Sequence, residues 1–237
     1  MTDFTGTDLA CLRGQRLVFA GLDFALPSGG ALVLTGPNGT GKSSLLRLMA
    51  GLIRPFAGRL AWGEAAVADD PDAHRARVAY VGHAEAVKPV LSAQDNLTFW
   101  ARLSDPREAV ARTRLALEEV GLGGLEEVPG RYLSAGQKRR LSLARLLAAP
   151  ADLWLLDEPS VGLDADGRRR LEGMIARHRD RGGRVALSTH AEIALPGAGR
   201  LDLARFAVDP AAGDLMEAGE AVAEREEDAP GEGAGAR

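Results

Sequence analysis

The sequence has only one cysteine, no long apolar run and no strong excess of positive charge. Among its 237 residues Cys11 stands alone, so an internal disulfide is excluded. The first residues, Met1 to Phe4, lack the charged and then apolar layout of a signal peptide. We therefore expect a cytosolic protein.

The absence of long apolar runs limits how the chain can meet a membrane. Even the segment from Leu141 to Leu156 is interrupted by Arg145, Pro150 and Asp152, and a spanning helix needs about 18 or more apolar residues. Any membrane contact is expected to be peripheral. The 29 basic and 33 acidic residues give a formal net charge of −4, which argues against a nucleic-acid partner. With 46% hydrophobic residues the chain can bury a substantial core.

The most informative stretch is Gly36 to Ser43, which fits the phosphate-binding pattern G-x-x-x-x-G-K-[ST]. A strand-length apolar run, Ala31 to Thr35, precedes it, and a helical segment from Ser43 to Ala50 follows it. Its glycines let backbone N–H groups curl around an anion at a helix N-terminus. The residues expected to bind nucleotide here are Gly36, Pro37, Asn38, Gly39, Thr40, Gly41, Lys42, Ser43 and Ser44.

Two side chains of this loop, Lys42 and Ser43, have specific predicted roles. Lys42 supplies a positive charge for the outer phosphates, and the Ser43 hydroxyl is a candidate ligand for Mg²⁺. The alternative is a glycine-rich turn with an incidental lysine, because short motifs also match by chance. The rest of the chain favours the phosphate-binding interpretation.

The wider pattern predicts an α/β fold with a mostly parallel sheet, an antiparallel β-layer and a helical insert. Residues 1–215 are expected to form one domain, with the insert at about 92–132, and residues 216–237 are expected to be a disordered acidic tail. The predicted strands lie within 9–26 and at 31–35, 59–63, 78–82, 153–156 and 185–188. The predicted helices cover 43–50, 92–103, 106–120, 141–148 and 167–179.

Two carboxylates end the apolar strand that begins at Leu153. Asp157 and Glu158 are neighbours, so on a strand they point to opposite faces and can do different work. In a phosphate-binding-loop enzyme the first acid holds Mg²⁺ and the second orients or deprotonates the attacking water. Acids at strand ends are also common without any catalytic role.

A second glycine-containing stretch, Leu133 to Gln137, precedes three cations, Lys138, Arg139 and Arg140. Ser134 and Gln137 have the spacing of a capping box, which predicts a helix start. Three positive charges in a first turn oppose the helix dipole unless an anion lies nearby. A triphosphate at this helix N-terminus is one such anion.

The order of these motifs resembles that of the ATP-binding-cassette ATPases. The resemblance rests on Gly36 to Ser43, Leu133 to Gln137 and Leu156 to Pro159, and it extends from about Leu9 to Phe206. It implies a homodimer that sandwiches two ATP molecules with Mg²⁺, in which Ser134, Gly136 and Gln137 act on nucleotide held by the other copy. It also implies that residues 161–164 cross the dimer interface and that His190 contacts the γ-phosphate.

Two positions depart from the usual pattern of this family. Arg13 stands where an aromatic residue usually stacks on adenine, and a guanidinium can also stack on a base. His83 stands where a glutamine usually senses Mg²⁺ and the membrane partner, so it is a candidate metal ligand or coupling residue.

The segment from Gly82 to Leu97, together with the loop flank Ser44 to Leu52, resembles the ATP-binding subunit of the cytochrome c maturation system, often called the haem exporter. This likeness implies integral membrane permease subunits as partners and a peripheral place on the cytoplasmic face of the bacterial inner membrane. Other small-substrate exporters share most of these features. A soluble cassette ATPase of translation or DNA repair is a further alternative, and a nucleotide-binding module that does not hydrolyse ATP is another.

Overall fold

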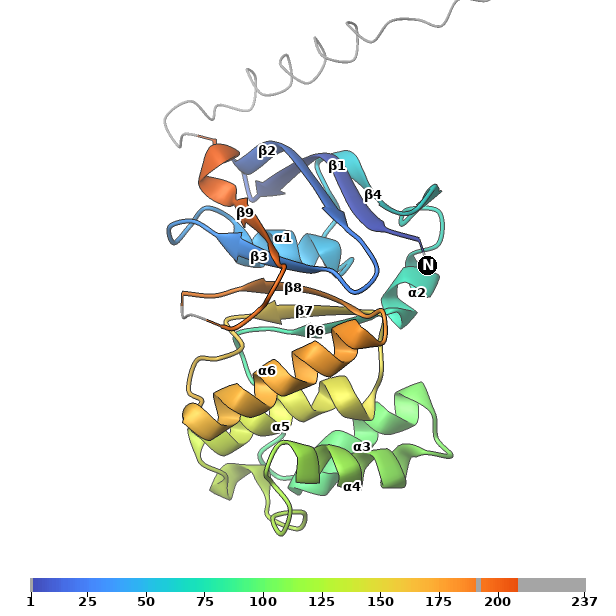
Figure 1. Ribbon diagram of the computed structural model, residues 1–237, viewed down its shortest axis with the longest axis vertical. Helices are drawn as coiled ribbons and strands as arrows, with labels where there is room; N and C mark the ends of the chain where they lie inside the picture. Colours follow the sequence, from blue (N-terminus) through green and yellow to red (C-terminus); the bar gives the residue numbers. More distant parts are fainter. Residues whose placement is uncertain (1, 191–192, 209–237) are drawn as a thin grey trace, which may run out of the picture.

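The computed structural model describes residues 2–190 and 193–208. Its helices and strands form successive layers, with an antiparallel sheet, one helix, a parallel sheet and two further layers of helices (Figure 1). The strands are β1 Phe4–Arg13, β2 Arg16–Leu26, β3 Ala31–Thr35, β4 Ala57–Trp62, β5 Ala65–Ala66, β6 Val78–Val81, β7 Leu153–Asp157, β8 Arg184–Ser188 and β9 Gly199–Asp202. The α-helices are α1 Lys42–Met49, α2 Pro71–Ala76, α3 Ala93–Ser104, α4 Ala109–Glu119, α5 Ala135–Ala148 and α6 Ala165–Asp180.

The two sheets differ in strand direction. One is antiparallel with the order β2-β1-β4-β5, and the other is parallel with the order β6-β7-β8-β3-β9. The carboxyl ends of β3, β7 and β8 therefore meet at one edge of the parallel sheet, as expected of a doubly wound fold. The predicted fold class is confirmed.

Helix α1 lies between the two sheets (Figure 1). Its leucines and Met49 are fully buried against side chains of both sheets, including Phe4 and Phe19 from the antiparallel one. Such a continuous core holds the beginning of α1 at a fixed distance from the end of β3.

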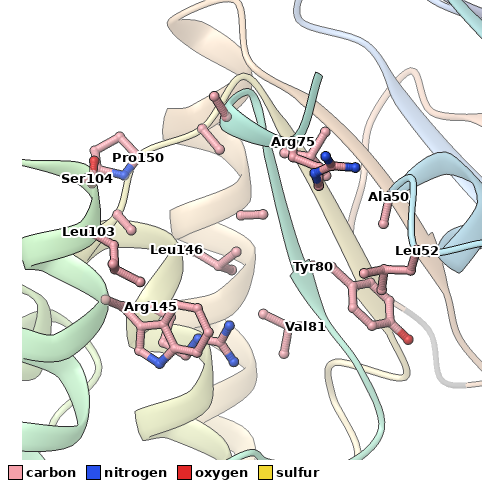
Figure 2. Close-up of a pocket in the computed structure, with 16 residues that line it drawn as sticks. Ala50, Leu52, Arg75, Tyr80, Val81, Leu103, Ser104, Arg145, Leu146 and Pro150 are labelled. Carbon is pink, nitrogen blue, oxygen red and sulfur yellow. The ribbon is translucent and has the colours of Figure 1, made fainter. Parts of the chain in front are cut away.

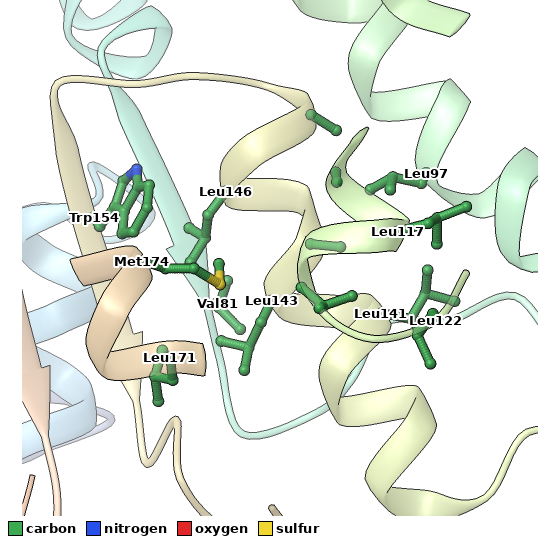
Figure 3. Packing of buried hydrophobic residues seen from close by; sticks show 14 of the residues in the cluster. Val81, Leu97, Leu117, Leu122, Leu141, Leu143, Leu146, Trp154, Leu171 and Met174 are labelled. Atoms are coloured by element: carbon green, nitrogen blue, oxygen red, sulfur yellow. The ribbon is translucent and has the colours of Figure 1, made fainter. Parts of the chain in front are cut away.

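The other face of the parallel sheet is covered by α5 and α6, and α3 and α4 lie beyond α5 (Figure 1). Figure 3 shows one apolar cluster running from Trp154 on β7 through Leu143 and Leu146 on α5 to Leu97 on α3 and Leu117 on α4. The helices of the predicted insert thus share a core with the sheet. Helix α5 therefore connects α3 and α4 to the parallel sheet.

Several predicted boundaries need correction. Strand β1 begins at Phe4 rather than at Leu9, and α4 begins at Ala109 rather than at Pro106, because the Asp105 carboxylate accepts a bond from the Arg107 N–H and forms a turn there. Helix α5 begins at Ala135, not at Leu141. Helix α2 and the edge strand β9 were not predicted. The proposed tail at 216–237 lies outside the described residues.

Candidate functional site

The loop between β3 and α1 has the backbone that a phosphate-binding loop requires. Gly36, Gly39 and Gly41 have φ angles of 127°, 87° and 98°, a region that side chains other than glycine rarely tolerate. A Cβ added at Gly41 would lie 2.8 Å from side-chain atoms of Val18 and Phe19, so the loop also packs closely on β2. Helix α1 begins directly after it, which directs its free N–H groups toward the loop.

Lys42 is the first residue of α1, and it is buried with its charge close to the loop. Its Nζ donates to the carbonyl oxygens of Gly36 at 2.7 Å and Pro37 at 3.0 Å. The Thr40 hydroxyl donates to the same Pro37 carbonyl at 2.9 Å. The ammonium group therefore sits at the rim of the loop, where a phosphate oxygen could replace a carbonyl as its acceptor.

Asp157 ends β7 and is 3% exposed. Its Oδ1 accepts hydrogen bonds from the Ser43 hydroxyl at 3.0 Å and from the Ser188 hydroxyl at 2.7 Å. The predicted pair, Ser43 and Asp157, is thus brought together from β7 and α1. A hydroxyl beside a carboxylate is a hard oxygen donor set, which suits Mg²⁺ when phosphates and water supply the remaining ligands.

Glu158 follows Asp157 in a strained conformation, with a φ of 49°. Such left-handed backbone costs on the order of 1–3 kcal/mol for a residue other than glycine and occurs often at functional sites. The Glu158 N–H donates to the Ser188 carbonyl and hydroxyl, both at 3.1 Å. These bonds fix the Glu158 backbone against the end of β8, and only 16% of the Glu158 side chain is exposed.

His190 lies beside this second carboxylate. Its backbone N–H donates to Glu158 Oε2 at 3.2 Å, and its Nε2 lies 3.5 Å from Glu158 Oε1. The same ring nitrogen is 3.1 Å from Oδ1 of Asn38 in the loop. His190 therefore links the end of β8 to the loop across the space that faces both Glu158 and Lys42.

These residues line one cleft of about 360 Å³, which we call the P-loop cleft. His83, after β6, lines it as well. The lining residues are Val18, Asn38, Gly39, Gly41, Lys42, Ser43, Ser44, His83, Asp157, Glu158 and His190. Within the described residues no group of three or more histidine, cysteine or carboxylate side chains could hold a metal ion. Ser43 and Asp157 stay the candidate magnesium ligands that lie in contact with each other, and His83 lines the same cleft.

Seven of the predicted site residues are not among those that line this cleft, namely Gly36, Pro37 and Thr40 of the loop itself and Arg13, Ser134, Gly136 and Gln137. Arg13 is exposed at the end of β1, beside the turn to β2, and Val18 of β2 occupies the cleft wall instead. Ser134, Gly136 and Gln137 lie at the start of α5, where Ser134 and Gln137 form a complete capping box. The capping prediction is confirmed.

Two of the cations that follow this cap have partners within the chain. Arg139 is 3% exposed and donates to the carbonyl oxygens of Gly82, Asp157, Glu158 and Pro159 at 2.7–3.3 Å. Arg140 donates to the carbonyls of Val120 and Gly121. Backbone carbonyl dipoles therefore stabilise the charges of Arg139 and Arg140, and a triphosphate at this helix N-terminus stays a prediction.

Sequence reasoning missed two residues that shape the site. Ser188 holds both Asp157 and the Glu158 backbone, and Arg139 holds the carbonyls around the two acids. Burial lowers the pKa of Arg139, while Glu85, Asp157 and Glu158 act in the opposite direction. The signal available for Ser188 was its position at the end of a predicted strand, two residues before His190.

The comparisons with known proteins point to one family. The family model described as ABC transporter matches residues 19–161. The cytochrome c biogenesis ATP-binding export protein CcmA of Paramagnetospirillum magneticum is 58% identical over 207 residues, covering 86% of this chain and 95% of the relative. The protein of the same name from Rhodospirillum rubrum is 57% identical over 216 residues, covering 90% and 92%.

A solved structure of the ATP-binding subunit of an ABC transporter has a TM-score of 0.72 with this chain. It is 25% identical, and the match covers 80% of each chain. In residues 2–190 and 193–208 no helix is both long enough and apolar enough to cross a bilayer.

Proposed function

The chain belongs to the ABC transporter family, and from this membership we propose that it is the ATP-hydrolysing subunit of a complex that handles haem in cytochrome c biogenesis. The observation that carries the ATPase assignment is the single cleft that unites Lys42, Ser43, Asp157, Glu158 and His190. The cytochrome c biogenesis pathway is supported by the names of relatives that are 57–58% identical over most of their length, and haem as the cargo is inferred from the resemblance of Gly82 to Leu97 to the haem exporter.

The side chains of the cleft have separate roles in the proposed hydrolysis of ATP. The loop N–H groups and Lys42 bind the phosphates of ATP, and Ser43 and Asp157 are the residues that would hold Mg²⁺, which neutralises phosphate charge when bound. Glu158 accepts a proton from the attacking water as the bond from the γ-phosphorus to the bridging oxygen breaks, which yields ADP and phosphate. His190 orients the γ-phosphate and holds the Glu158 carboxylate in place.

A second copy of the chain completes this site. Ser134 and Gly136 are not among the residues that line the P-loop cleft of their own chain, and Ser134 is exposed at the N-terminus of α5. In the proposed homodimer, α5 of one copy points its N-terminus at the γ-phosphate bound by the other, which favours negative charge. Light scattering of Glu158→Gln with ATP and Mg²⁺ should give twice the monomer mass, and Ser134→Arg should prevent this change.

The docking surface that we assign to a membrane partner lies between the sheet and the helical insert. An open, mostly apolar groove of about 530 Å³ lies there, which we call the Trp100 groove (Figure 2). Its lining residues are Ala50, Leu52, Arg75, Ala76, Val78, Ala79, Tyr80, Val81, Trp100, Leu103, Ser104, Arg145, Leu146, Ala149, Pro150 and Ala151. We assign it to a cytoplasmic helix of the permease, which would hold this chain at the inner face of the membrane.

Two substitutions test the docking assignment. Trp100→Ala removes a large apolar wall of the groove, and Asp95→Lys reverses a charge at the start of α3, where Asp95 caps the helix with Ser92. Both should reduce recovery of the membrane partner without abolishing ATP binding. Unchanged recovery with Trp100→Ala would reject this groove as the docking surface, and unchanged recovery with Asp95→Lys would remove the start of α3, outside the groove lining, from the interface.

The experiment for the pathway is capture of the complex. Glu158→Gln should retain ATP and hold the closed state longest, so it is purified with ATP and Mg²⁺ from detergent-solubilised membranes of its own host. Recovery of multi-spanning cytochrome c maturation proteins supports the proposal. A different permease would make the chain the ATPase of another small-substrate exporter, and ribosomal or DNA-repair proteins without a permease would refute the transporter assignment.

A further inference from the structure

Arg145 is a largely buried cation with an unusual environment. Its guanidinium carbon lies 3.7 Å from the centre of the Trp100 ring, so one face of the group stacks on the indole. Its Nε is buried and has no hydrogen-bond partner among residues 2–190 and 193–208. Burial lowers the pKa of Arg145, and no carboxylate of the described chain is placed to offset this effect.

The surroundings of Arg145 contain positive charge but no negative charge. Arg145 lines the Trp100 groove, and Figure 2 shows it reaching from α5 toward Val81 on β6. The other charged lining residue is Arg75, which already pairs with Asp72 on the exposed side of α2. No aspartate or glutamate is among the residues that line the groove. An unpaired buried cation in an apolar groove is destabilising unless something else supplies a negative group.

We propose that the segment docking in the Trp100 groove is an apolar helix of the membrane partner that presents an aspartate or glutamate to Arg145. This inference rests on the proposed function and specifies the chemistry of its partner. Because Trp100 covers one face of the guanidinium, a carboxylate would approach the group along its edge, where two parallel hydrogen bonds can form. Arg145 is thus a specificity-determining residue, since a partner without the acid leaves its charge unpaired.

The acidic end of this chain is a poorer occupant of the same groove. Residues 217–237 carry many glutamates, but their largest apolar side chain is Val222. The groove, by contrast, is walled by Leu52, Tyr80 and Leu103, and Leu52 and Leu103 are 58% and 68% exposed. A segment with both large apolar residues and a carboxylate fits these walls better.

Capture measures the contribution of Arg145 with a matched control. Full-length Glu158→Gln is purified with ATP and Mg²⁺ from host membranes, alone and combined with Arg145→Met or Arg75→Met. Methionine keeps an apolar contact with the Trp100 ring but removes the charge. Arg145→Met should reduce the recovered permease by about tenfold or more, whereas Arg75→Met should change it less than threefold. Equal losses with both variants would contradict a specific role for Arg145.

Zero-length cross-linking identifies the carboxylate and does not depend on how stable the methionine variant is. Arg145→Lys keeps the charge and adds an amine, which a carbodiimide couples to a carboxylate in direct contact. Mass spectrometry should find the amide bond on an aspartate or glutamate of a cytoplasmic permease segment. A cross-link to residues 217–237 would assign the groove to the chain's own tail and overturn the proposal.

The outcomes distinguish a failure of the Arg145 inference from a failure of the proposed function. If Glu158→Gln recovers a permease but Arg145→Met recovers as much and Arg145→Lys gives no cross-link to it, only the Arg145 inference fails. If no membrane protein is recovered with Arg145 intact, the proposed function fails and the inference fails with it.

Discussion

Arg139 offers the sharpest test of how the site is held together, because one side chain supports four backbone carbonyls. Replacing it by methionine keeps most of its length and removes all the donors. The freed carbonyls belong to Gly82, Asp157, Glu158 and Pro159, so they surround both candidate acids. We expect loss of stability together with loss of catalytic geometry.

The size of the effect follows from these bonds and from burial. A hydrogen bond from a charged donor contributes about 1.5–3 kcal/mol, but burying the guanidinium, which is 3% exposed, cancels part of that gain. Leaving a buried carbonyl without its donor costs about 1–3 kcal/mol, and Arg139 serves four of them. We therefore expect Arg139→Met to lower the free energy of unfolding by about 3 kcal/mol and Arg139→Lys to recover part of it.

Urea denaturation measures the stability change, and phosphate release at low temperature measures turnover of the folded fraction. Turnover of Arg139→Met should fall by about tenfold or more, because a small displacement of Glu158 misaligns the base. Lys138→Met is the matched control from the same helical turn, and it should change stability by less than about 0.5 kcal/mol. A loss below 1 kcal/mol for Arg139→Met would refute the account of this cluster.

Three further predictions concern other parts of the chain. Gly58→Ala should destabilise the fold by about 3 kcal/mol or more in urea denaturation, because Gly58 has a φ of 79° and an added Cβ would clash with the Asp8 carbonyl oxygen. Gly123→Ala, where the nearest atom is 3.7 Å away, is the control and should be close to neutral. Burial beside Trp154 lowers the pKa of His178 to about 4 in the folded chain. In the unfolded chain His178 binds a proton with a pKa of about 6.5, so protonation between these two values favours unfolding. The stability due to neutral His178 is full above about pH 6.5 and is lost as the pH falls toward 4. Relative to His178→Phe, the wild type should therefore lose about 2 kcal/mol between pH 7 and pH 4.5, and an equal pH dependence of the two proteins would refute this assignment. Ser43→Ala removes a hydroxyl 3.0 Å from Asp157 and should raise the Mg²⁺ concentration for half-maximal phosphate release by about tenfold, while an unchanged Mg²⁺ profile would remove Ser43 from the metal site.

The parts of the site that the sequence predicted well are those formed by consecutive residues. The order of strand, loop and helix around Gly36 to Ser43 was predictable because glycine spacing and apolar runs act locally. The capping box of Ser134 was predictable for the same reason. In each case the residues that form the motif lie within a few positions of each other in the sequence.

The parts that were missed depend on contacts between distant residues. Arg139 turns toward carbonyls near positions 82 and 158, and nothing in its own helical turn indicates this direction. Strand β9, Gly199–Asp202, has one large apolar residue and forms because β3 offers it an open edge. Patterns along the chain do not reveal which surface a cation or an edge strand will meet.

The measurement that tests the central claim most directly is steady-state phosphate release by the wild type and by Glu158→Gln, with ATP affinity measured on both. The account predicts hydrolysis by the wild type, similar ATP binding in both proteins and a rate about 10²-fold or more lower in the variant. Wild-type turnover in Glu158→Gln would contradict the role of Glu158 as general base. A wild type that binds ATP without releasing phosphate, even with its membrane partner, would contradict the ATPase assignment itself.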